Sequence, residues 1–355
     1  MIRVHILTAG ATSPNGTAFI LPILKFKNNL LNSGFDIKIN PRKQEITDCD
    51  YLIIESKFYK QGWNQKRQQV LSEIEDFSQK TIVIWCDQSD STGTISAEVL
   101  PFVQTYAKAQ LLVDKDIYLS PMYGSRIYTD YYHKNFSVTD EEYYCEPTVR
   151  NKNHLKKFKI SWNSAFLNFG KFQPYWLLLA KRLPFSNCVP FSRKALPSFS
   201  NRVQDISVRM GTNHKRETVA FQRKQIASMF ESKAKAKKIS RKNYLNEVAN
   251  SKICISPFGY GEITLKDFEV FLSGSVLLKP SMRHMRTWPD LFIEDETYVS
   301  HDWNFTNIAE KIEWLLANEA SRLNIADLGQ KLFIEHTIGK SAGDKFAAQF
   351  SSLFN

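Results

Sequence analysis

Short apolar runs alternate with longer amphipathic segments along the first 120 residues. The runs rich in β-branched residues predict strands at 2–7, 35–40, 50–56 and 80–87. Apolar positions at helical spacing predict helices over 18–34, which ends at a glycine, and over 64–79. Strands separated by helices favour a parallel sheet with crossover connections. Ligands gather beyond the carboxyl ends of such strands, so we expect residues 8–17 and 87–94 on the functional rim.

The alternation stops after residue 120 and resumes near residue 203. Residues 120–200 show little periodicity, and we expect long excursions attached to the first domain. The proline- and serine-rich stretch 183–202 predicts a linker. The second half predicts strands at 203–211, 252–256, 275–280 and 297–302, and helices at 217–232, 240–250, 307–322 and 341–354.

These elements predict an α/β fold of two Rossmann-like domains facing each other across a cleft. We place an N-terminal domain at 1–185, a linker at 186–202 and a C-terminal domain at 203–335. The last segment, 336–355, predicts a helix that packs back on the N-terminal domain.

Composition describes an ordinary globular chain with a basic excess. Hydrophobic residues make up 43% and charged residues 23%, and the formal net charge is +11. That charge suits nucleic acid, an anionic membrane surface or a phosphorylated small molecule equally well. The five cysteines lie far apart and predict reduced thiols. The N-terminus predicts a strand and loop rather than a signal peptide, and no apolar run reaches the about 18 residues of a membrane span. We therefore expect a cytoplasmic protein.

One segment, SPFGYGEITLKDFEVFLSGSVLLKP at 256–280, concentrates unusual features. Gly259 and Gly261 flank Tyr260 in a predicted turn. Thr264 and Asp267 have capping-box spacing and predict a helix that stops at Gly274. The N–H groups at such a helix start attract an anion such as a diphosphate. Two carboxylates follow the turn, Glu262 and Glu269; without further information they are a solvated loop residue and a surface helix residue.

Residues 251–292 resemble the donor-binding region of GT-B glycosyltransferases, in particular the exostosin-like branch of bacterial polysaccharide biosynthesis. The resemblance implies that this loop and helix hold a nucleotide sugar, with Glu262 at the sugar and Glu269 at the ribose. The two acids are one residue closer together than in the better-known retaining families, so inversion and retention both stay open. A second run, ISVRMGTNHKRETVAFQRKQI at 206–226, resembles the first strand, loop and helix of a GT-B donor domain. It implies phosphate contacts from cations at the helix entrance, against the alternative of a solvated basic face. The donor-binding residues implied are Arg209, Lys215, Arg216, Arg223, Gly259, Tyr260, Gly261, Glu262, Thr264 and Glu269.

The N-terminal domain of a GT-B enzyme supplies the acceptor side and the group that takes the acceptor's proton. Asp87 and Asp90 follow a predicted strand and are the candidates, although an Asp in this position is often a cap or turn residue. His284 and Arg286 either meet the donor or belong to a surface loop, and His5 is expected in the core. The sequence has no HExxH, no paired-histidine motif, no P-loop and no GxGxxG. We therefore expect a metal-independent enzyme without a cofactor.

Together these features predict a glycosyltransferase that moves a sugar from a nucleotide-diphosphate donor to a glycan or lipid-linked acceptor in surface polysaccharide or glycoconjugate synthesis. The basic charge would then support donor capture and peripheral docking on the inner face of an anionic membrane. One alternative keeps the fold but uses a non-nucleotide donor such as phosphoribosyl pyrophosphate. The other is a nucleic-acid-binding or DNA-modifying protein, which the dispersed basic residues disfavour.

Overall fold

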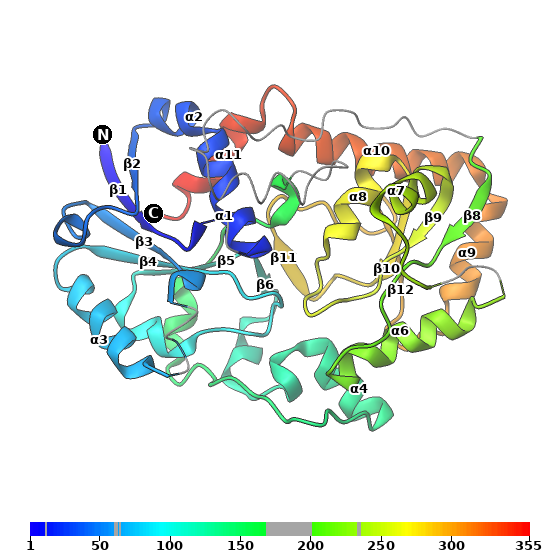
Figure 1. The fold of residues 1–355 in the computed structure, drawn as a ribbon, viewed down its shortest axis with the longest axis horizontal. Helices are drawn as coiled ribbons and strands as arrows, with labels where there is room; N and C mark the ends of the chain where they lie inside the picture. Colours follow the sequence, from blue (N-terminus) through cyan, green and yellow to red (C-terminus); the bar gives the residue numbers. More distant parts are fainter. Residues whose placement is uncertain (11–12, 60–62, 64, 168–200, 233–235) are drawn as a thin grey trace.

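The computed structural model describes residues 1–10, 13–59, 63, 65–167, 201–232 and 236–355. Within these ranges the chain forms two parallel sheets that lie side by side, each flanked by helices (Figure 1). The predicted α/β class with two Rossmann-like sheets is confirmed. The predicted linker, 186–202, falls almost wholly outside the described residues.

The first sheet has the order β2-β1-β3-β4-β5-β7, and its neighbouring strands are parallel. The order reverses between β1 and β3, and at such a point the loops beyond the carboxyl ends of the strands diverge and leave a crevice. The bounds are β1 Ile2–Leu7, β2 Phe35–Ile39, β3 Tyr51–Glu55, β4 Ile82–Asp87, β5 Thr105–Lys108 and β7 Phe158–Ile160.

The helix expected over 18–34 begins earlier and divides in two. Ser13 caps it, since its hydroxyl accepts from the N–H of Gly16. The chain leaves helical geometry at Phe26, four residues after Pro22, and the second helix ends before Gly34, which has a φ of 90°. The bounds are α1 Pro14–Lys25, α2 Lys27–Asn32 and, after β3, α3 Arg67–Ser78.

The second sheet has the order β12-β10-β9-β8, again parallel. Its strands are β8 Gln204–Ser207, β9 Ser251–Ile255, β10 Val276–Pro280 and β12 Val299–His301. Its helices are α6 Glu217–Met229, α7 Arg241–Asn250, α8 Leu265–Ser273 and α9 Ile308–Ala317. The predicted elements of this half are therefore present, with strand β8 shorter than the expected 203–211.

The weak periodicity after residue 120 does not reveal a helix that the structure has there. Residues Ile127–Phe136 form helix α4, and it packs against α6 of the second half rather than on the first sheet (Figure 1). Tyr132 is fully buried there, with its ring 5.4 Å from that of Phe221 and 5.9 Å from that of Phe305. The polar sequence of α4 hides this role, because its tyrosines are buried by a partner distant in sequence.

The C-terminal helices cross from the second half to the first along one edge of the molecule (Figure 1). The helix predicted over 307–322 breaks at Asn318, and a longer helix, α10 Glu319–Thr337, follows it. Helix α11, Ala342–Ser351, then lies against the first sheet, where the ring of Phe350 is 5.2 Å from that of Phe35. The C-terminal segment is thus part of the core of the N-terminal half.

A two-stranded antiparallel ribbon also joins the halves. Strand β6, Gln110–Leu112, pairs with β11, Met285–Thr287. The Thr287 hydroxyl donates to the carbonyl of Ala109 at 2.6 Å and accepts from the Asn163 amide at 3.0 Å. These contacts fix the loop after β10 against the end of the first sheet.

Candidate functional site

The start of helix α8 is built by a local polar network. The Asp267 carboxylate accepts from the backbone N–H and the hydroxyl of Thr264, at 2.8 and 3.0 Å. This confirms the predicted capping box, and Gly274 ends the helix with a φ of 69°. Asp267 is fully buried and forms an ion pair with Lys279 of β10 at 3.0 Å. The helix start is therefore anchored to the sheet and directed at the space beyond β9.

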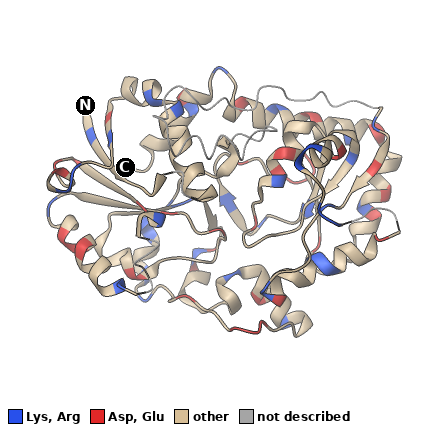
Figure 2. Ribbon diagram, in the orientation of Figure 1, with Lys and Arg blue, Asp and Glu red and all other residues tan. Residues whose placement is uncertain are grey.

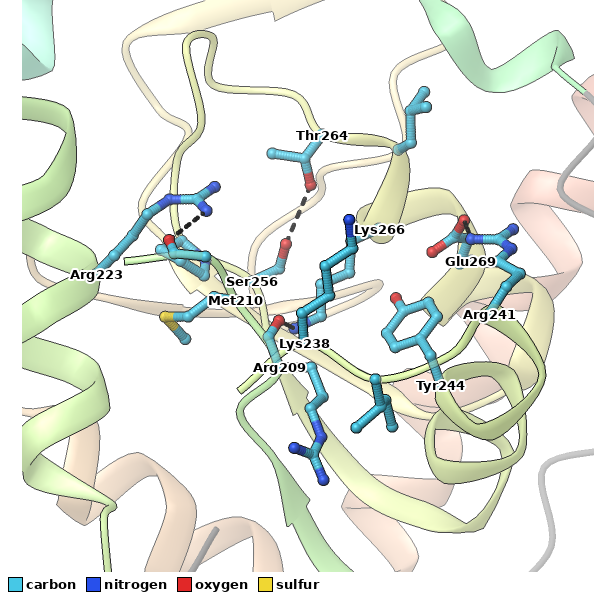
Figure 3. Close-up of a pocket in the computed structure, with 14 residues that line it drawn as sticks. Arg209, Met210, Arg223, Lys238, Arg241, Tyr244, Ser256, Thr264, Lys266 and Glu269 are labelled. Atoms are coloured by element: carbon cyan, nitrogen blue, oxygen red, sulfur yellow. Dashed lines mark hydrogen bonds and ion pairs between the residues drawn. The ribbon is translucent and has the colours of Figure 1, made fainter. Parts of the chain in front are cut away.

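A cavity of about 560 Å³ lies in front of this helix start (Figure 3). Four of the residues implied as donor-binding line it, namely Arg209, Arg223, Thr264 and Glu269. Ser256 and Pro257, from the loop after β9, line it as well. The cavity thus stands at the carboxyl ends of the second sheet's strands, where α/β folds bind their ligands.

Two cations of this cavity bond to backbone carbonyls instead of carboxylates. The Arg223 guanidinium donates to the carbonyls of Phe258 and Gly211 at 2.8 and 3.0 Å. The Lys266 ammonium donates to those of Ile255 and Arg209 at 2.6 and 2.9 Å. Burial lowers the pKa of Arg223, and it lowers the pKa of Lys266 to about 8. A desolvated pair of cations beside a helix N-terminus is a binding site for an anion. Arg209 differs, because Glu247 neutralises it at 2.8 Å.

Another part of the cavity wall carries a buried carboxylate. Glu269 is 6% exposed and accepts from the Arg241 guanidinium at 2.5 Å. Burial raises the pKa of Glu269, although Arg241 acts against this effect. Tyr244 lies beside the pair on the same wall (Figure 3). A carboxylate held in this way can accept hydrogen bonds from ligand hydroxyls.

The glycine turn contacts the first half of the chain and does not itself line this cavity. Glu262 is fully buried and accepts from the N–H and hydroxyl of Thr92, at 3.0 and 2.6 Å. Burial opposes its ionisation, but His284 and the bonds from Thr92 lower its pKa overall. The carbonyl of Tyr260 accepts from Arg126 at 2.5 Å, and that of Gly259 accepts from Tyr128 at 2.8 Å.

Six of the residues implied as donor-binding therefore do not line the cavity. A buried carboxylate needs hydrogen-bond donors, and the first half supplies them to Glu262. At Gly261 a β-carbon would overlap the carbonyl of Asp90, so this glycine permits the close approach of the two halves. Arg216 lies against the first half, with its guanidinium 4.8 Å from the ring of Tyr144, and Lys215 is exposed. The six are Lys215, Arg216, Gly259, Tyr260, Gly261 and Glu262.

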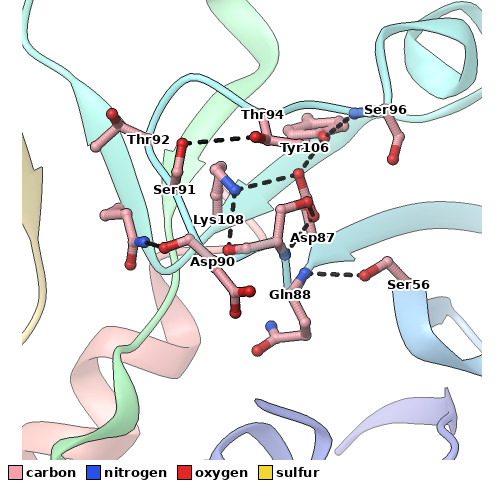
Figure 4. A network of polar contacts seen from close by, with 12 residues as sticks. Ser56, Asp87, Gln88, Asp90, Ser91, Thr92, Thr94, Ser96, Tyr106 and Lys108 are labelled. Atoms are coloured by element: carbon pink, nitrogen blue, oxygen red, sulfur yellow. Dashed lines mark hydrogen bonds and ion pairs between the residues drawn. The ribbon is translucent and has the colours of Figure 1, made fainter. Parts of the chain in front are cut away.

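The two predicted proton acceptors have different surroundings (Figure 4). Asp87 is fully buried and accepts from the hydroxyls of Ser89 and Tyr106, at 2.5 and 2.6 Å, with the Lys108 ammonium at 3.4 Å. Burial alone would raise its pKa, but Lys108 and these hydrogen bonds lower it. Asp87 thus fixes the loop after β4. Asp90, three residues later, is exposed, and one of its oxygens accepts from Asn15.

Comparison with known proteins finds similarity at the level of structure. No protein-family model matches the sequence, and no curated protein matches it. Among solved structures, the chain is similar to "alpha-glucosyltransferase (AGT) in complex with UDP", at 10% identity over 100% of both chains with a TM-score of 0.44. It is also similar to Anabaena Alr3699/HepE in complex with UDP-glucose, at 8% identity over 99% of this chain and 100% of that one, with a TM-score of 0.44.

Among the described residues, no group of three or more His, Cys, Asp or Glu side chains is arranged to hold a metal ion. No helix in that part of the chain has the length and apolar character needed to cross a membrane.

Sequence reasoning missed several residues of the cavity wall. Lys266 is the second residue of α8, so the capping-box spacing that located the helix could have placed its side chain near the anion site. Arg241 and Tyr244 are three residues apart on α7, a spacing that puts both on one helix face. Lys238 lies just before that helix. Lys238, Arg241 and Tyr244 lie in a segment without glycine, and the fold alone brings them to the cavity.

Proposed function

We propose that this protein is a GT-B-type glycosyltransferase that uses a nucleotide-diphosphate sugar. The observation that carries the proposal is the pair Arg223 and Lys266, desolvated and without carboxylate partners among the described residues, at the N-terminus of α8 in a cavity of about 560 Å³. The diphosphate would bind these cations and the positive end of the helix dipole. Glu269 would accept hydrogen bonds from the ribose.

The same site would stabilise the leaving group. The acceptor oxygen forms a bond to the anomeric carbon, the bond from that carbon to the diphosphate oxygen breaks, and the diphosphate leaves with the electron pair. The acceptor's proton passes to Asp90, the exposed member of the predicted pair. The cations and the helix N-terminus take up the charge that develops on the diphosphate, so we expect no need for a metal.

The acceptor would be a glycan or a lipid-linked sugar, in surface polysaccharide synthesis of the exostosin-like kind. Figure 2 shows basic and acidic positions interspersed over both halves, without a single basic stripe that would follow a nucleic-acid backbone. The net charge of +11 instead fits donor capture and peripheral docking on an anionic membrane from the cytoplasm.

Calorimetric titration with UDP, GDP, CMP and phosphoribosyl pyrophosphate, in EDTA, tests the donor class. We expect one nucleoside diphosphate to bind. Arg223→Ala should weaken it about 10- to 100-fold, the equivalent of one charge-assisted hydrogen bond. Lys224→Ala is the matched control, because Lys224 is exposed and pairs with Glu217 outside the cavity. If only phosphoribosyl pyrophosphate binds, the donor is of that class and not a nucleotide sugar. If binding needs Mg²⁺, the expectation of a metal-independent enzyme is wrong.

A further inference from the structure

A second cavity lies in the first half of the chain and takes no part in the donor site. Its volume is about 350 Å³. Ser56 and Lys57, which follow β3, and Asp87, Ser89 and Asp90, at the end of β4 and just after it, form part of its wall. It therefore opens at the carboxyl ends of strands beside the reversal in strand order, where this type of sheet binds ligands.

The loop 256–264 borders both cavities. Ser256, Pro257 and Thr264 line the first cavity. The carbonyl of Tyr260 accepts from Arg126, which lines the second, and Gly261 lies against the backbone of Asp90, which also lines it. A molecule in the second cavity is thus separated from the donor site by this one loop.

One carboxylate in the second cavity lacks a partner within the described residues. Glu146 is half-buried and makes no side-chain hydrogen bond or ion pair there, and burial raises its pKa. A buried polar group without a partner is costly, so the Glu146 carboxylate favours a ligand that donates hydrogen bonds to it. A hydroxyl group can donate in this way.

The same cavity offers an apolar face. The ring of Trp63 is half-buried and lies 5.8 Å from that of Trp85, and both line the cavity. A sugar ring combines hydroxyl groups with an apolar C–H face, which packs on an indole. The charged lining is mixed, with Lys57 and Arg126 beside Asp87, Asp90 and Glu146, so the cavity has no excess of cations that would select a phosphate-bearing ligand.

We infer that this second cavity is the acceptor site and binds an uncharged sugar ring, with Trp63 under its apolar face and Glu146 accepting hydrogen bonds from its hydroxyls. The inference rests on the proposed function, since an acceptor requires a donor. Glu146 is then a residue that determines acceptor specificity, and Asp90 lies at the side of the cavity next to the donor loop.

Saturation-transfer difference NMR tests the inference with methyl glycosides of glucose, galactose, mannose and N-acetylglucosamine, on protein loaded with the nucleoside diphosphate that binds it most tightly. We expect at least one glycoside to bind. Glu146→Gln and Trp63→Ala should each weaken it about tenfold, the loss expected for one hydrogen bond to a charged group. Glu142→Gln and Trp314→Ala are matched controls, because both side chains are exposed and outside the cavity.

The nucleotide affinity and the thermal unfolding temperature of every variant distinguish a wrong acceptor site from a wrong donor assignment and from a variant that has lost its fold. If the nucleotide binds but no glycoside does, or if glycoside binding survives both cavity variants, the acceptor site is wrong and the donor assignment stands. If glycosides bind as expected but no nucleoside diphosphate does, the cavity is not an acceptor site and the proposed function fails with it.

Discussion

Lys266 occupies a position where its charge depends on pH near neutrality. Among the described residues its ammonium donates only to backbone carbonyls, and burial lowers its pKa to about 8. A lysine with a lowered pKa is charged below that pH and loses its proton as the pH rises through it. The charge is the feature that a diphosphate would recognise.

We therefore expect the affinity for a nucleoside diphosphate to fall as the pH rises from 8 to 9. Binding above pH 8 should take up a proton, which titrations in buffers of different ionisation enthalpy will detect. Lys266→Arg keeps the charge throughout this range and should flatten the dependence. An equally steep fall in Lys266→Arg would show that another group causes it.

The sequence located part of this site because some of its signals are local. Thr264, Asp267 and Gly274 act on residues within a few positions, so spacing alone predicted the start and end of α8. The partners of Glu262 and Asp87 were not predictable in this way. Thr92 is 170 residues from Glu262, and the burial of Asp87 depends on Tyr106 and Lys108 of the neighbouring strand. The sequence does not distinguish a carboxylate that lines an open cavity from one that holds two segments together.

At the scale of elements, the loop 256–264 joins the two halves and also forms part of the wall of the cavity in front of α8. The glycine turn within it brings its backbone against the loop after β4, and only a residue without a side chain fits at Gly261.

Helices α4 and α10 were not predictable from local sequence signals. Their buried faces contact elements far away in sequence, and α4 has a polar composition, so periodicity alone did not reveal them.

Gly261→Ala should destabilise the protein by about 1–3 kcal/mol, the usual cost of inserting a methyl group into a packed site. The obstacle is the backbone of Asp90, which cannot rotate aside as a side chain could. Gly211→Ala is the control, because a β-carbon there meets nothing within 4 Å. Urea unfolding of both variants measures the difference. Equal midpoints for the two variants would mean that the turn adapts without cost.

At the scale of the whole molecule, the two halves are joined by several independent contacts. Helix α4 packs on α6, strands β6 and β11 form a ribbon, and α11 returns to the first sheet. The bonds from Thr92 to Glu262 add a buried polar contact between the two halves. The relative position of the halves should therefore depend on it.

Thr92→Val removes the hydroxyl donor while keeping the shape and the backbone N–H. The carboxylate of Glu262 then loses its 2.6 Å bond in a fully buried setting. We expect a loss of about 1.5–3 kcal/mol in the free energy of unfolding at pH 7, and none for Thr92→Ser, which keeps the hydroxyl. The pKa of Glu262 is lowered in the folded protein, so its stabilising effect is present above its unfolded pKa and is lost as the pH falls through its folded value. The deficit of Thr92→Val should consequently shrink in acid. In Glu262→Gln the same substitution should cost less than in the wild-type chain, and a double-mutant cycle with no coupling between the two positions would contradict this account of the interface.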